Sequence, residues 1–72
     1  MAEVKAELVG NLWKITTEVG QQVEEDDTIM ILESMKMEIP VPAEVAGVIT
    51  EITVNEGDVV NEGDSIAVIE PS

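Results

Sequence analysis

The residues of this sequence that could carry chemistry are few, and they gather around one lysine. The chain has no Cys and no His, so it lacks a thiolate nucleophile, a disulfide, the commonest metal ligand and the usual general base. Most catalytic sites are thereby excluded, and no metal site is expected. The only unusual local sequence surrounds Lys36, one of the three lysines, whose amine becomes a nucleophile when it loses its proton. Its neighbours are Glu33, Ser34, Met35, Met37 and Glu38.

The position of Lys36 depends on the segments on either side of it. If residues 28–33 and 37–41 form neighbouring antiparallel strands, Lys36 lies at the tip of a tight hairpin and its amine projects into solvent. Taken alone, Met35, Lys36 and Met37 also fit a plainer interpretation, in which an ordinary turn lysine stands between two flexible apolar residues that cap one end of the core.

The composition favours strands for the elements that hold this turn. Apolar residues make up 44% of the chain, and nearly all are aliphatic, with Trp13 as the only aromatic residue. Val and Ile dominate, and both are typical of strands, whereas helical periodicity is nowhere sustained. The predicted strands cover residues 4–7, 12–17, 22–24, 28–33, 37–41, 48–54, 59–61 and 65–70.

An internal repeat organises these strands. Residues 10–33 align without a gap on residues 47–70, with nine identical pairs in the 24 positions. Two copies are too few for a solenoid, so the repeat predicts one closed domain made of two equivalent halves related by a pseudo-twofold axis.

The turns and proline positions refine this prediction. Gly20, Gly57 and Gly63 are expected to adopt positive φ in their turns. Asp26 stands where the second half has Gly63 and can make the same turn with some strain. The prolines at positions 40 and 42 place the segment after Lys36 at an edge or a strand end.

Length and charge limit the possible partners. Seventy-two residues suffice for one small core, so a single domain over residues 1–72 is expected, monomeric when isolated. The net charge of −13 argues against nucleic-acid or membrane partners and favours a basic one, although it also serves solubility alone. No signal peptide or membrane-spanning run is present, and we expect a cytoplasmic protein.

The segment 33–38, with an Ile- and Leu-rich strand before it and Pro42-Ala43 after it, closely resembles the attachment motif of biotinyl domains. That family carries Ala or Ser and then Met-Lys-Met between two half repeats that contain Gly-Asp, and here the second is intact at residues 57–64. The resemblance covers almost the whole chain and is closest to the small stand-alone biotin/lipoyl attachment proteins. The starting Met1 favours the stand-alone form over a carrier domain at the end of a larger carboxylase.

The resemblance implies an all-β fold, a flattened eight-stranded barrel or sandwich of two four-stranded antiparallel sheets, with the modified lysine at one end and the termini at the other. It implies a biotin carboxyl carrier protein, with biotin joined to Lys36 by a biotin protein ligase. The biotin would then shuttle carboxyl groups between biotin carboxylase and carboxyltransferase subunits, so the chain itself is no enzyme. Met35 and Met37 are expected to be read by the ligase, and Glu33, Ser34 and Glu38 to contribute more weakly.

Some positions depart from the family pattern, and two other functions remain open. Gln21 replaces the Asp of the first half repeat and Leu8 stands where the family often has Pro, changes that are expected to weaken a turn and leave the attachment site intact. A lipoyl carrier domain shares the fold but usually has Asp before the lysine and Ala after it, where Met35 and Met37 stand here. The third possibility is an unmodified acidic interaction module in which Lys36 is incidental.

Overall fold

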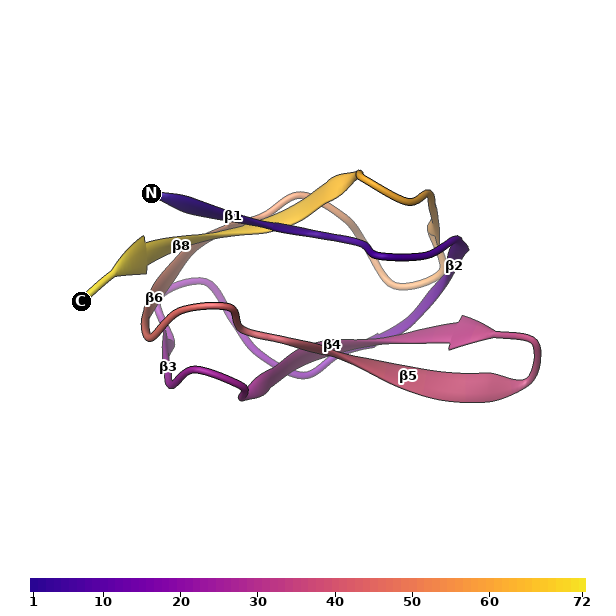
Figure 1. Ribbon diagram of the computed structural model, residues 1–72, viewed down its shortest axis with the longest axis horizontal. Coiled ribbons are helices and arrows are strands. Elements are labelled where there is room, and N and C mark those ends of the chain that lie inside the picture. Colours follow the sequence, from indigo (N-terminus) through magenta and orange to yellow (C-terminus); the bar gives the residue numbers. More distant parts are fainter.

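The computed structural model describes residues 1–72 and contains eight strands and no helix (Figure 1). The strands are β1 (Ala2–Lys5), β2 (Gly10–Ile15), β3 (Gln22–Val23), β4 (Thr28–Ser34), β5 (Met37–Pro42), β6 (Gly47–Ile52), β7 (Val59–Val60) and β8 (Ser65–Pro71). No element is a helix long and apolar enough to cross a bilayer. The all-β prediction and its eight strands are confirmed.

The strands form two four-stranded antiparallel sheets, one in the order β1-β8-β6-β3 and the other in the order β5-β4-β2-β7. The predicted sandwich is therefore correct. Strand β5 is an edge strand, which suits Pro40 and Pro42 because a proline has no N–H to donate to a further neighbour. Alternate side chains of both sheets meet between them in a core of aliphatic residues. Its largest fully buried members are Leu12, Ile29, Met30, Leu32, Ile49, Ile66 and Ile69.

The two halves of the chain occupy equivalent places. Exchanging β2 with β6, β3 with β7 and β4 with β8 turns three of the four positions in the order of one sheet into those of the other. The hydrogen bonds follow the same exchange: the N–H of Gly20 donates to the carbonyl of Ile49 at 2.7 Å, and the N–H of Gly57 donates to that of Leu12 at 2.7 Å. The repeat seen in the sequence therefore corresponds to a structural pseudo-twofold.

The equivalence extends further toward the amino terminus than residues 10–33. The N–H of Gly63 donates to the carbonyl of Ala6, and the N–H of Asp26 donates to that of Ala43, both at 2.8 Å. Strand β1 is thus the counterpart of β5 under the pseudo-twofold. In the sequence, Val4-x-Ala6-Glu7 matches residues 41–44 at the same offset of 37 residues. The sequence carries this signal too, before the first repeated glycine.

The turns have the predicted backbone. The φ angles are 92° at Gly20, 93° at Gly57, 88° at Gly63 and 75° at Asp26, so Asp26 makes the glycine's turn in the left-handed region. The turn at Gln21 also forms, although Gln stands there in place of the Asp found in the second half. Its Oε1 accepts a hydrogen bond from the N–H of Glu18 at 3.1 Å, as Asp58 Oδ2 does from Asn55 at 2.9 Å in the other half.

The predicted ends of β1, β2 and β6 were wrong by two residues, since β6 ends at Ile52 and not at residue 54. Strand β1 stops at Lys5 because Ala6 turns its N–H and carbonyl to Asp64 and Gly63, in the loop before β8. Strand β2 stops at Ile15 because the carbonyl of Ile29 accepts both the N–H of Thr16, at 3.2 Å, and the hydroxyl of Thr17, at 2.9 Å. A side-chain hydroxyl thus takes the place of the next ladder bond.

The molecule is elongated, with principal extents of 34 × 17 × 17 Å. Figure 1 shows the β4–β5 hairpin at one end of the long axis and both termini at the other. The two sheets therefore hold the hairpin as far from the chain ends as the fold allows, in agreement with the arrangement expected for a carrier of the resembled family.

Candidate functional site

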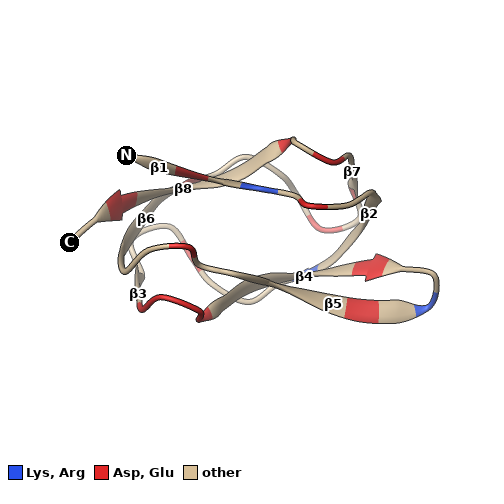
Figure 2. Cartoon of the chain, viewed as in Figure 1, with Lys and Arg blue, Asp and Glu red and all other residues tan.

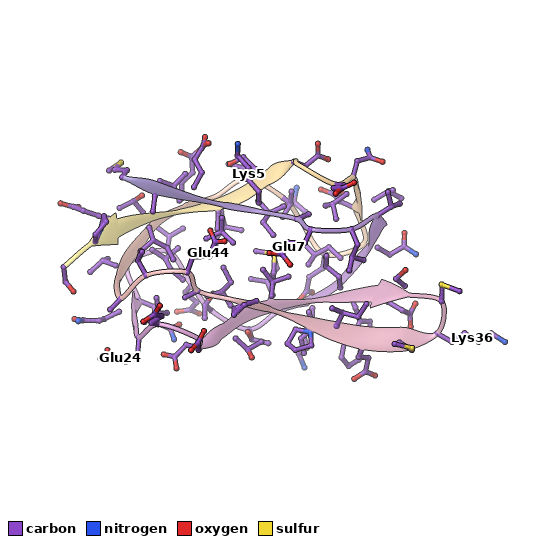
Figure 3. The ribbon with its side chains drawn as sticks, viewed as in Figure 1. Lys5, Glu7, Glu24, Lys36 and Glu44 are labelled. Atoms are coloured by element: carbon purple, nitrogen blue, oxygen red, sulfur yellow. The ribbon has the colours of Figure 1, made fainter.

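The candidate site is the turn between β4 and β5. These strands pair in register up to Ser34 and Met37, which leaves Met35 and Lys36 as the two turn residues. The prediction that Lys36 lies at a tight hairpin tip is therefore confirmed. Figure 3 shows its side chain extending outward along the long axis, away from both sheets.

The backbone of this turn is unusual for the residues that form it. The φ angle is 52° at Met35 and 62° at Lys36, and positive φ at both central residues is the requirement of a type I′ turn. That turn matches the twist of antiparallel strands, but it favours Asn and Gly. A non-glycine residue held in the left-handed region costs on the order of 1–3 kcal/mol. The paired strands must therefore hold Lys36 in place against its own backbone preference.

The turn side chains face solvent. Met35 is 91% exposed and Met37 is 62% exposed, so the interpretation of both methionines as caps of the core is wrong. Lys36 is exposed, and it takes part in no side-chain hydrogen bond or ion pair; the one ion pair of the chain joins Lys5 Nζ to Glu3 Oε2 at 4.0 Å. The amine is thus free of contacts that a modification would break.

Below the turn, the hairpin brings two carboxylates together. Glu33 of β4 and Glu38 of β5 are directly opposite each other, both exposed, and like charges at such positions destabilise a sheet. Ser34 is half-buried beside them, opposite Met37. The sequence predicted these residues near Lys36, but it did not identify the Glu33–Glu38 pairing, which the two-residue turn implies once its length is known.

The other two lysines lie in strands. Lys5 ends the edge strand β1, and Lys14 stands in β2 beside a bulge, facing water. All three lysines are exposed, so exposure does not distinguish Lys36. Figure 2 shows a basic position at the hairpin tip and acidic positions spread over both sheets and their turns. What distinguishes Lys36 is its place in a turn at the end of the long axis.

One shallow hollow lies elsewhere, between the edge strands β1 and β5. Its apolar lining comes mainly from Val4, Leu8, Ile39 and Val41, and the exposed residues Glu7 and Glu44 also line it. It contains none of the turn residues. No group of three carboxylates or other metal-ligating side chains is arranged to hold a metal ion. The arrangement can therefore present a free amine at the hairpin tip.

Comparison with known proteins agrees with this geometry. The Biotin/lipoyl attachment protein of Bacillus subtilis is 50% identical over 38 residues, which cover 53% of this chain and 52% of that protein. The Biotinylated protein TB7.3 homolog of Mycolicibacterium smegmatis is 54% identical over 42 residues, covering 57% of this chain and 59% of the relative. The chain thus aligns with little more than half the length of these relatives.

Solved structures contain the same sandwich. The Kluyveromyces lactis urea carboxylase superposes with a TM-score of 0.91 and 38% identity over 96% of this chain and 6% of the carboxylase. A single-chain, multi-domain long-chain acyl-CoA carboxylase superposes with a TM-score of 0.92 and 25% identity over 99% of this chain and 7% of that protein. The biotin/lipoyl family model, described as biotin-requiring enzyme, matches residues 2–69, and the chain therefore belongs to the biotin/lipoyl attachment family.

Proposed function

We propose that the chain is a biotin carboxyl carrier domain in which biotin is joined by an amide bond to Nζ of Lys36. The observation that carries the proposal is the place of Lys36, in a two-residue turn at the end of the long axis with a free amine. The sandwich shared with two carboxylases supports the same function.

The residues of the turn fit this modification. Acylation converts an ammonium group into a neutral amide, and a lysine in an ion pair would lose that contact. Lys36 has none to lose, and its neighbours at the tip are exposed, so an enzyme can approach it from outside. The ligase must remove a proton from the amine and supply activated biotin, because no side chain of this chain makes a hydrogen bond or ion pair with Nζ of Lys36.

The work of the chain is to hold and present the attached group. Bound biotin supplies a ring nitrogen that accepts and releases a carboxyl group, and the catalytic groups belong to biotin carboxylase and carboxyltransferase partners. The strained turn and its paired strands fix the base of a long, flexible arm. Tethering confines the ring to a small volume and raises its effective concentration at each partner site. The chain is therefore a carrier and no enzyme.

The residues around Lys36 have graded roles in this proposal. Met35 and Met37 present exposed thioether side chains on both sides of the lysine and are the residues that a biotin protein ligase reads. Glu33, Ser34 and Glu38 contribute less. The paired carboxylates lower the stability of the hairpin, which is consistent with a use in docking to a basic partner surface.

The test compares the lysines within one protein. After incubation with a biotin protein ligase, biotin and ATP, intact mass should show one biotinyl group on the parent and none on Lys36→Arg, because a guanidinium keeps its proton and its charge. The matched control, with Lys5→Arg and Lys14→Arg together, should be labelled like the parent. Full labelling of a folded Lys36→Arg protein, or loss of labelling in the folded control, would place the attachment elsewhere.

A lipoyl carrier remains the second candidate, because one relative is named a biotin/lipoyl attachment protein. The same assay with a lipoate ligase and lipoate separates the two. Exclusive modification of Lys36 by lipoate would replace the carboxyl-transfer proposal with an acyl-transfer one. If Lys36 accepts neither biotin nor lipoate, the acidic interaction module would be favoured.

A further inference from the structure

The four methionines of the chain have contrasting environments. Met30 is 0% exposed and packs in the core, whereas Met35 and Met37 stand in water on both sides of Lys36 and Met1 is 81% exposed at the far end. Methionine is usually a filler of apolar interiors. Two of the three exposed thioethers in this chain are therefore concentrated at the one turn where attachment is proposed.

Exposed thioethers react with peroxides. The sulfur takes one oxygen atom from hydrogen peroxide and becomes a sulfoxide, the sulfur is oxidised by two electrons, and the peroxide leaves as water. Methionine sulfoxide reductases reverse the change. Cysteine thiolates often react first in proteins, but this chain has no Cys. Its exposed thioethers are thus the side chains most open to this chemistry.

We propose that Met35 and Met37 form a reversible oxidation site that controls attachment at Lys36, an inference that rests on the proposed function. A sulfoxide turns a flexible apolar side chain into a polar one. That change alters the surface that an attaching enzyme meets on both sides of the lysine. Because neither side chain packs in the core, oxidation at the tip leaves the fold intact and acts on docking alone.

The core methionine supplies an internal comparison. Met30 belongs to the buried cluster, so peroxide reaches its sulfur only when the sheets open. Oxidation should therefore proceed in two stages, first at Met35, Met37 and Met1 and much later at Met30. Protein oxidised only in the first stage separates the effect of the tip from damage to the core.

The experiment treats the whole chain with limiting hydrogen peroxide and maps each methionine by peptide mass spectrometry. The initial rate of biotin labelling is then measured with ligase, biotin and ATP. We expect tip-oxidised protein to keep its circular dichroism spectrum and to be labelled at least about fivefold more slowly. Treatment with both methionine sulfoxide reductases should restore the rate. The control Met30→Leu, which conserves side-chain volume, should remain as sensitive to peroxide as the parent.

Other outcomes would overturn the oxidation site, and one of them would overturn the proposed function as well. Reduced protein that is labelled at Lys36, with oxidised protein labelled at the same rate, would overturn the oxidation site and leave the proposed function standing. Met30 oxidising as fast as the tip, or insensitivity of Met30→Leu, would also overturn it. Failure of reduced protein to accept biotin at Lys36 would overturn the proposed function and the oxidation site together.

Discussion

The positive φ of Met35 makes a quantitative prediction about stability. Replacing Met35 with Asn should stabilise the protein, because Asn tolerates the left-handed region that the turn requires and Met does not. The left-handed conformation costs a non-glycine residue on the order of 1–2 kcal/mol, and Asn should recover roughly half of that. Met35 is 91% exposed, so its removal sacrifices almost no packing. The expected net gain is about 0.5–1 kcal/mol.

This gain is measurable in a chain of 72 residues. For a domain of this size, 1 kcal/mol shifts the thermal midpoint by about 4–8 °C, so Met35→Asn should raise Tm by roughly 2–8 °C in circular dichroism melts. Met37→Asn is the matched control. Met37 lies in β5 without a positive φ, and Asn is disfavoured in strands, so the control should gain nothing. An equal or lower Tm in Met35→Asn than in Met37→Asn would refute the argument from strain.

Three further changes test other features. Gly63→Val should lower Tm by several degrees although the space beside its Cα is open, because its φ of 88° is strained for a β-branched residue; an unchanged thermal melt would count against the turn assignment. Glu38→Lys should replace the repulsion with Glu33 by attraction and stabilise by about 0.5–1 kcal/mol at low salt, a gain that should shrink in chemical denaturation at high salt. Met35→Asp combined with Met37→Ala should shift modification from biotin toward lipoate, and equal biotinylation of parent and double variant at limiting ligase would remove the methionines from the recognition argument.

Much of the site could be predicted from sequence because its signals are local. The change from an Ile- and Leu-rich strand to Met-Lys-Met and then to Pro40 and Pro42 marks a turn followed by an edge strand. The strained backbone at Met35 and Lys36 could not be predicted in the same way. Neither residue prefers the left-handed region. The positive φ of both residues arises because Ser34 and Met37 pair on the flanking strands.

The fold was predictable where the two halves repeat each other and less so where single hydrogen bonds decide the end of a strand. The strand ends near Thr16 and Thr17 depend on which donors reach the carbonyl of Ile29, a choice that no residue pattern contains. A contact between the two halves joins the N–H of Ile15 to the carboxylate of Glu56 at 2.9 Å. It has no counterpart in the other half, where Val19 stands in place of Glu56.

Under the pseudo-twofold, the two chain ends occupy the position equivalent to the β4–β5 turn. Strands β8 and β1 pair there as β4 and β5 do at the tip. With the offset of 37 residues that relates the halves, Ser72 is equivalent to Met35, and Met1 is equivalent to Glu38. A two-residue bridge of Lys and Met from Ser72 to Met1 would close a matching hairpin. A circular permutant opened in another loop would then be a two-headed carrier, with an acceptor lysine at each end of a rod 34 Å long.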